Sequence, residues 1–302
     1  MMYGMLGGEG VKNRIILAAL LLIILAVPGF ASSVQPQPRL QGKGGVTLQG
    51  IVVSRGKPSE LKPSHGAIAT GVVSYLPEGG DRWAVIIGIS DYSGTINDLD
   101  YCDDDAREFY DALLGYGWKP SHIKLLLDKK ATKENIFDAI VWMEGKEGVS
   151  DEVVFFYSGH GATSNYDVDD DGEKKDECIV PWECDSAYFI WDGNLKQAFE
   201  GFESERVMFY FDSCFCGGMD ELSGDGRLIL MASKENQLSS EGSVWKHGQF
   251  TYYFLEQGIT NAQADANQDT LVTFEEAFDY ASIFCQDQTP TASDSFTNDM
   301  LP

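Results

Sequence analysis

The chain has 302 residues, of which 43% are hydrophobic and 12% aromatic, enough to build one sizeable core. Lys and Arg number 22 against 47 Asp and Glu, which gives a formal charge of −25. So acidic a chain repels nucleic acid and anionic membrane surfaces and attracts cations and basic peptides. We therefore expect no nucleic-acid partner.

The first residues resemble a secretory signal. Lys12 and Arg14 precede the apolar run Ile15–Val27, and a small-x-small site ends at Ala31. The run is shorter than the roughly 20 residues that span a bilayer as a helix. We expect residues 1–31 to be a signal peptide and the protein to be secreted or held in the cell envelope. The alternative is an uncleaved anchor, and only then would the protein contact a membrane.

Residues 32–80 are rich in Gly, Pro, Ser and Gln, which is typical of a pro-segment or linker. One β-like run, residues 46–54, would at most add a strand to the main domain. The segment also carries basic residues, among them Arg55 and Lys57.

From Arg82 onward, apolar runs alternate with amphipathic segments. The predicted strands are 83–90, 123–128, 151–161, 206–214 and 227–233, and the first predicted helices are 103–117 and 131–145, the second capped by Thr132. This alternation predicts an α/β fold with a mainly parallel sheet and helices on both faces. In such sheets active residues follow the carboxyl ends of the strands.

Two of these strands end in loops with reactive side chains. One ends at Ser158-Gly159-His160-Gly161 and the other at Asp212-Ser213-Cys214. If the strands are neighbours, His160 can act as the base for a Cys214 thiolate and later protonate a departing amine. The backbone N–H groups of Gly161 and Cys214 would hold the oxyanion. The alternative is a core histidine and a buried structural thiol.

Several separated motifs occur in an order that resembles the caspase-like cysteine peptidases, in their metacaspase and prokaryotic caspase-domain branch. These motifs are WAVIIGISDY, LDYCDDDA, YSGHG, DSCFCGG and HGQFTYYFLEQG. The resemblance implies a three-layer sandwich over residues 81–290, with 291–302 as a C-terminal tail. Phe215 and Cys216 depart from the histidine and serine usual in the family. Cys216 also raises the question of oxidation with Cys214.

The resemblance further implies that Cys102, Asp105, Ser158 and Asp212 line the primary specificity pocket. Two carboxylates in one pocket favour an Arg or Lys side chain, so we expect cleavage of peptides and proteins after Arg or Lys. Two rival functions stay open: a non-catalytic calcium-binding scaffold with the same fold, and asparaginyl or transpeptidase chemistry. His247, in the HGQFTYY segment, is expected to cap or position a helix.

Two acidic loops resemble calcium sites, and metacaspases are commonly calcium-activated. In the first, Asp167, Asp169 and Asp171 alternate before Gly172, but Cys178 stands at the twelfth position, where Asp176 or Glu177 would have to substitute. The alternative is a solvated acidic loop.

The second loop lies within residues 261–285 and ends in a helix. It offers ligands at calcium-loop spacing, with Thr270 where glycine is usual. Its expected ligands are Asp265, Asn267, Asp269, Leu271, Thr273 and Glu276. No organic cofactor is expected. The six cysteines match no zinc pattern, and a disulfide such as Cys178 with Cys184 stays open.

Overall fold

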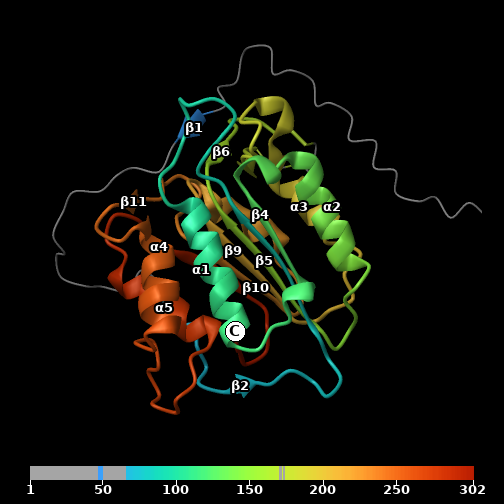
Figure 1. Cartoon of the computed structure of the whole chain (residues 1–302), viewed down its shortest axis with the longest axis vertical. Helices are drawn as coiled ribbons and strands as arrows, with labels where there is room; N and C mark the ends of the chain where they lie inside the picture. Colours follow the sequence, from blue (N-terminus) through green and yellow to red (C-terminus); the bar gives the residue numbers. More distant parts are fainter. Residues whose placement is uncertain (1–46, 50–65, 170–171, 173) are drawn as a thin grey trace, which may run out of the picture. The chain divides into compact units, whose positions relative to one another are not determined.

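A six-stranded sheet forms the centre of the fold (Figure 1). The computed structural model describes residues 47–49, 66–169, 172 and 174–302. The expected signal segment, the basic residues of the linker and Asp171 lie outside these residues. Within the described part, no helix combines the length and apolar character needed to cross a bilayer.

The sheet has the order β13-β10-β9-β5-β3-β4. All neighbouring strands are parallel except β13, which runs antiparallel to β10. β5 and β9, the central pair, are buried along their whole length, which explains their continuous apolar sequences. The bounds are β3 (Arg82–Gly88), β4 (Ile123–Leu127), β5 (Glu152–Ser158), β9 (Val207–Asp212), β10 (Arg227–Met231) and β13 (Thr291–Asp294).

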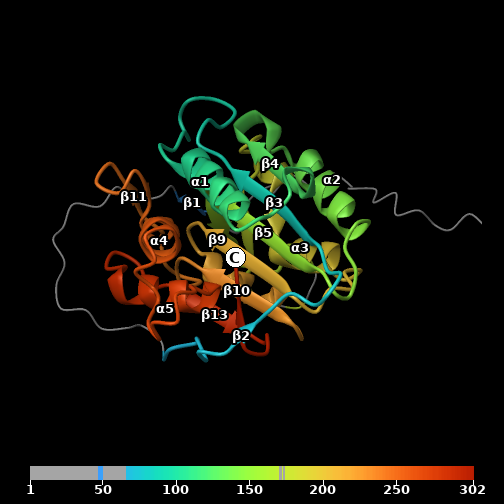
Figure 2. The same ribbon diagram turned by 60° about the horizontal axis from the view of Figure 1, so that its bottom comes forward.

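Helices cover both faces of this sheet (Figure 2). One face carries α1 (Cys102–Gly115), α4 (Gln249–Thr251), which continues into the wide helix η5 (Tyr252–Thr260), and α5 (Phe274–Phe284). The other face carries α2 (Lys133–Glu144) and α3 (Asp192–Ala198). The α/β fold with a mainly parallel sheet, expected from the sequence, is thereby confirmed.

Local sequence fixes where the longer helices begin. The hydroxyl of Thr132 accepts a hydrogen bond from the Asn135 amide at the start of α2, as expected. At α5, Thr273 and Glu276 form a reciprocal capping box. Asp103, Asp104 and Asp105 lie in the first turn of α1, where a negative charge is favourable.

A second, antiparallel sheet was not expected from the sequence. It consists of β1 (Thr47–Gln49), β6 (Gly161–Thr163), β7 (Glu177–Ile179) and β8 (Ile190–Trp191), in the order β1-β6-β7-β8. Gln49 of the predicted pro-segment lies opposite Gly161. These strands are too short for an alternation of polar and apolar residues to be recognised.

The last residues are part of the fold. Residues 291–302, expected to form a tail, supply β13 to the main sheet and β14 (Asp299–Met300) to a small parallel pair with β2 (Val73–Ser74). The Asp299 carboxylate also accepts hydrogen bonds from the amides of Thr70 and Gly71. The tail is therefore corrected to an edge of the domain, because its backbone groups pair with the sheet.

Shorter elements complete the chain. A hairpin of β11 (Glu241–Gly242) and β12 (His247–Gly248) precedes α4. Single 3-10 turns are η1 (Pro120–His122), η2 (Asp128–Lys130) and η3 (Ser186–Tyr188), and η4 (Cys216–Leu222) is a longer 3-10 helix of seven residues.

Candidate active site

Strand register brings the two reactive loops together. β5 and β9 pair in parallel with Ser158 opposite Asp212, and His160 and Cys214 each follow two positions later. The backbones touch, because a side chain at Gly161 would collide with the Cys214 carbonyl oxygen. The predicted base and nucleophile therefore leave the same edge of the sheet on adjacent strands.

The protein holds His160 from three sides. Its Nε2 lies 2.7 Å from the Asn97 carbonyl oxygen, its amide donates to the Tyr92 hydroxyl at 2.7 Å, and its carbonyl accepts from the Tyr157 hydroxyl at 2.7 Å. A carbonyl only accepts, so the Asn97 contact places the ring proton on Nε2. The Nδ1 nitrogen then carries the basic lone pair. The sequence had not indicated Asn97, Tyr92 or Tyr157.

Cys214 is a buried thiol. The Ser239 amide donates a hydrogen bond to its sulfur at 3.3 Å. Burial raises the pKa of Cys214 to about 12, because desolvation outweighs the stabilisation of the thiolate by that amide. The next residue, Phe215, has φ +62°, a left-handed conformation that non-glycine residues rarely adopt. The chain thus turns sharply away directly after the thiol.

None of the six cysteines, all within the described residues, forms a disulfide, so the Cys178–Cys184 pair left open by the sequence is not joined. Cys216 is buried, and its sulfur contacts the Phe211 carbonyl oxygen and the Ser233 hydroxyl, each at 3.5 Å. The residue that departs from the usual serine is held here as a structural thiol.

The four residues expected to line the primary pocket are all fully buried: Cys102, Asp105, Ser158 and Asp212. Ser158 donates to Asp105 at 2.8 Å. Ser239 and Thr251, which the sequence did not single out, donate to Asp212 through their hydroxyls at 2.6 and 2.8 Å. Hydroxyl groups of the protein itself thus already occupy both acids, where a substrate side chain would have to bind.

Burial and mutual repulsion set the ionisation of these acids. Burial, followed by the charge of Asp105, raises the pKa of Asp212 to about 6. Burial also raises the pKa of Asp105, and the hydrogen bond with His247 opposes this effect. Near neutral pH, Asp212 is close to its titration point.

His247 lies on β12 and caps none of the described helices, but it contacts three carboxylates, two on α1 and one on η5. Its Nδ1 is 2.8 Å from Asp105, and its Nε2 is 2.9 Å from Glu108 and 3.5 Å from Glu256. Burial lowers the pKa of His247, but the hydrogen bonds with Asp105 and Glu108 outweigh this effect and raise it to about 10. The ring therefore carries a positive charge beside the predicted pocket.

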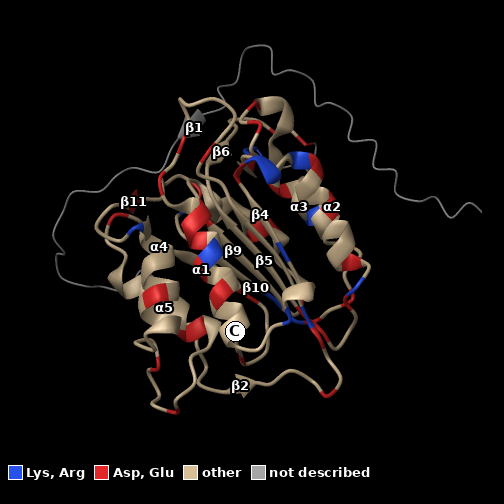
Figure 3. Ribbon diagram, viewed as in Figure 1, with Lys and Arg blue, Asp and Glu red and all other residues tan. Residues whose placement is uncertain are grey.

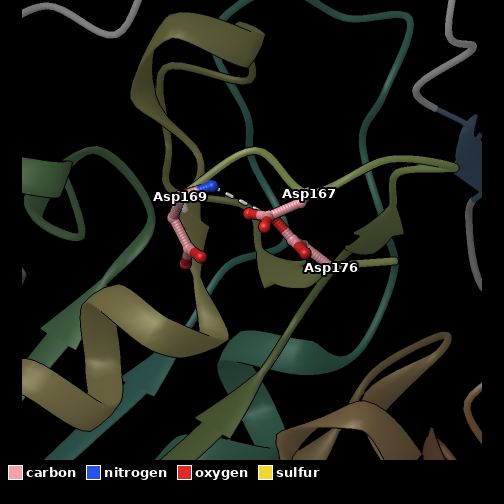
Figure 4. Close-up of side chains that lie close together, drawn as sticks. All are labelled: Asp167, Asp169 and Asp176. Atoms are coloured by element: carbon pink, nitrogen blue, oxygen red, sulfur yellow. Dashed lines mark hydrogen bonds between the residues drawn. The ribbon is translucent and has the colours of Figure 1, made fainter. Parts of the chain in front are cut away.

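The first acidic loop gathers three carboxylates (Figure 4). Oxygens of Asp167, Asp169 and Asp176 lie within 4.8 Å of one another. The Asp169 amide donates to Asp176 at 3.2 Å, which brings the two ends of the loop together. Of the two residues that the sequence had left open, Asp176 is the one whose carboxylate lies with those of Asp167 and Asp169.

A fourth carboxylate lies beside this group. Asp192, at the start of α3, is 1% exposed, and burial followed by the charges of Glu177 and Asp169 raises its pKa to about 9. A side-chain carbon at Gly193 would lie 2.7 Å from an Asp169 oxygen, so Asp169 packs directly on this helix start. The three converging carboxylates, with Asp192 beside them, are an all-oxygen set that fits a hard cation such as calcium. The sequence did not indicate Asp192, because only the fold brings the start of α3 against the loop.

The second acidic loop is closed by its own hydrogen bonds. The Asp265 carboxylate accepts from the amides of Asp269 and Thr270 at 3.1 Å, and Thr270 has φ +72° where glycine was expected. Glu276 binds the Thr273 amide in the capping box. Among the side chains that the structure describes, the carboxylates of Asp265, Asp269 and Glu276 do not converge as the first group does.

Comparison with known proteins places these features in a family. The caspase domain, as a sequence family, matches residues 81–301. The chain is 33% identical over 202 residues to metacaspase-1 of Candida albicans, covering 60% of this chain and 44% of the relative. It is 31% identical over 175 residues to metacaspase-1 of Candida glabrata, covering 55% and 43%. The chain thus spans less than half the length of these relatives.

Structural similarity supports the same fold. The crystal structure of protein GSU0716 from Geobacter sulfurreducens superimposes with a TM-score of 0.54 at 19% identity, covering 70% of this chain and 92% of the other. The family match includes both strand ends with their histidine and cysteine and extends over more than half of the sequence. The chain therefore belongs to the caspase-domain family of cysteine peptidases and is a distant homologue of the fungal metacaspases.

Proposed function

We propose that the protein is an endopeptidase that hydrolyses peptide bonds after Arg or Lys, with Cys214 as nucleophile and His160 as base. The observation that carries the proposal is the parallel pairing of β5 and β9, which aligns Ser158 with Asp212 and hence His160 with Cys214. Family membership supports the reaction class. The carboxylates beside the dyad support the basic specificity.

The chemistry follows from the tautomer of His160. With the Nε2 proton held on Asn97, the Nδ1 lone pair takes the Cys214 proton as sulfur attacks the substrate carbonyl carbon. The amides of Gly161 and Cys214 are the proposed donors to the resulting oxyanion. Collapse breaks the C–N bond, and His160 returns the proton to the leaving amine. Water then hydrolyses the thioester with His160 as base, which restores the thiol.

Asp105 and Asp212 are the proposed partners of the substrate's Arg or Lys side chain, with Cys102 and Ser158 beside them. A guanidinium in contact with two carboxylates forms charge-assisted hydrogen bonds that a neutral side chain cannot form. Because both acids are fully buried, binding requires that an internal partner give way.

Calcium is the proposed regulatory ion, held by Asp167, Asp169, Asp176 and Asp192. The loop connects β6 to β7, and β6 begins at Gly161 beside the Cys214 backbone. An ion in this loop would order the strand that carries one proposed oxyanion donor. Calcium in the second loop is a separate proposal with a structural role, and its proposed ligands are Asp265, Asn267, Asp269, Leu271, Thr273 and Glu276.

The N-terminal region completes the proposal. Residues 1–31 act as a signal peptide, which places the enzyme outside the cytoplasm, and residues 32–80 form a pro-segment that the enzyme removes near Arg55 or Lys57. The pairing of Gln49 with Gly161 supports a pro-segment that contacts the site. Sequencing the N-termini of wild type and Cys214→Ala tests self-processing, and identical termini would refute it.

The main test compares fluorogenic peptides that end in Arg, Lys, Asp and Asn, with calcium or with excess chelator. We expect cleavage of the Arg and Lys peptides only, a strong calcium dependence, and no cleavage by Cys214→Ala. A preference for Asp would refute the basic specificity, and a preference for Asn would favour asparaginyl chemistry. Unchanged rates with chelator would refute regulation by calcium.

One observation favours a second candidate, a non-catalytic calcium-binding scaffold. The Cys214 thiol is buried with a pKa of about 12, and the acids beside it are bonded internally. A peptide electrophile that ends in Arg distinguishes the two. Covalent labelling of Cys214 supports the peptidase, whereas no labelling with calcium present supports the scaffold.

A further inference from the structure

The His247 ring bridges buried and exposed acids. Nδ1 faces Asp105 at 2.8 Å and Nε2 faces Glu108 at 2.9 Å. A neutral imidazole donates from one nitrogen only, whereas carboxylates only accept. With both acids ionised, two such contacts at hydrogen-bond distance are satisfied together only by the doubly protonated, positively charged ring.

The same contacts run from the interior to the surface. The Asp105 side chain is 0% exposed and that of His247 is 11% exposed, while those of Glu108 and Glu256 are 31% and 34% exposed. Glu108 belongs to α1, whose acidic residues are visible in Figure 3, and Glu256 belongs to η5. His247 thus lies between the buried acid of the proposed specificity pocket and solvent.

The main chain beside His247 packs against both acids of the proposed specificity pocket. A side chain at Gly248 would collide with the Asp212 carboxylate, and the Gly248 amide donates to Asp105 at 3.3 Å. Glu241, which lies opposite Gly248 on the other strand of the hairpin, binds the amides of Asp100 and Tyr101 at 3.0 and 3.1 Å. The hairpin backbone is therefore held on both strands, whereas the ring of His247 is anchored through its carboxylate contacts.

We propose that His247 is a specificity-determining residue, a resident cation that pairs with Asp105 until a basic substrate side chain replaces it. This inference rests on the proposed cleavage after Arg or Lys. As the substrate cation reaches Asp105, the ring turns outward and keeps its charge paired with Glu108 and Glu256. If an uncharged substrate side chain displaced the ring, Asp105 would lose its ion pair with His247 and gain no other cation. The exchange therefore selects for a substrate with a positive charge.

The test compares two charge changes that this exchange predicts to act in opposite directions. His247→Gln removes the competing cation, so KM for an Arg-ending peptide should fall about three- to tenfold, as expected for a partly exposed ion pair. Glu108→Gln combined with Glu256→Gln removes carboxylates that the ring contacts in both positions. The resident ring still has Asp105, whereas the outward ring is left without a carboxylate, so KM should rise by a similar factor. Asp111→Asn, an exposed change on α1 that removes one charge away from His247, is the control and should leave KM within about twofold.

Each possible result either supports or refutes the exchange of His247 for the substrate cation. If His247 only supports the fold, both changes should lower kcat or raise KM together, and that result would overturn the proposal. If His247→Gln does not fold, the Glu108 and Glu256 variant alone decides, because unchanged KM there removes the outward exchange. A wild type that cleaves no Arg or Lys peptide refutes the proposed function, and this inference with it. A wild type that prefers Arg while KM is equal in all variants refutes this inference alone.

Discussion

Replacing Asp192 with Asn tests the proposed calcium site at the residue least visible in the sequence. The carboxyl is 1% exposed, lies beside Asp169 and accepts hydrogen bonds from the Glu177 and Gly193 amides. With a pKa of about 9 it is protonated at pH 7.5 in the absence of metal. Calcium must displace that proton, so binding should strengthen as pH rises toward 9.

The magnitude follows from linkage between binding and folding. At free calcium 100 times the dissociation constant, binding stabilises the folded state by about 2.7 kcal/mol. For a domain of this size that corresponds to a rise in Tm of about 5–10 °C. Asp192→Asn should weaken calcium binding about 10- to 100-fold, as losses around metal sites typically do. The same calcium concentration then contributes only about 0.4–1.4 kcal/mol, so the rise should shrink to about 1–5 °C.

Calorimetry at pH 7.5 with calcium or chelator measures both values. Asp138→Asn, an exposed change on α2, is the control and should retain the full rise in Tm. Asp265→Asn separates any contribution of the second loop. An undiminished rise in Asp192→Asn would refute the assignment of this carboxylate. A wild type without any rise would refute calcium binding altogether.

Two further predictions concern charge in the buried interior. Asp212 is protonated below pH about 6 and then no longer attracts a cation. The preference for an Arg peptide over its citrulline analogue, measured as the ratio of their kcat/KM values, should therefore fall as the pH drops through 6. A constant ratio would exclude Asp212 from recognition of the Arg side chain. Arg206→Met leaves Glu152 buried with its closest cation removed, so the free energy of unfolding should drop by about 3–5 kcal/mol. The double variant with Glu152→Gln should regain most of this loss, as measured by calorimetry. If it regains none, the loss in Arg206→Met does not come from the unpaired Glu152 carboxylate.

The sequence predicted the main sheet well because its strands are long and buried on both faces. Continuous apolar runs at β5 and β9 are strong signals, and so are the acidic first turn of α1 and the Thr132 cap. The second sheet was missed because its strands are only two or three residues long. The C-terminal strands were missed for a related reason: their polar residues form edges rather than core.

The sequence by itself determined the fold class, the family resemblance and the two reactive strand ends, because these depend on local apolar patterns and motif order. Tertiary structure alone decided what surrounds them. It placed Asn97 against His160, Ser239 against Cys214, and Asp192 beside the acidic loop, contacts between segments far apart in the chain. It also turned His247 into a cation among three acids, because the charge of an imidazole depends on the groups that packing places around it.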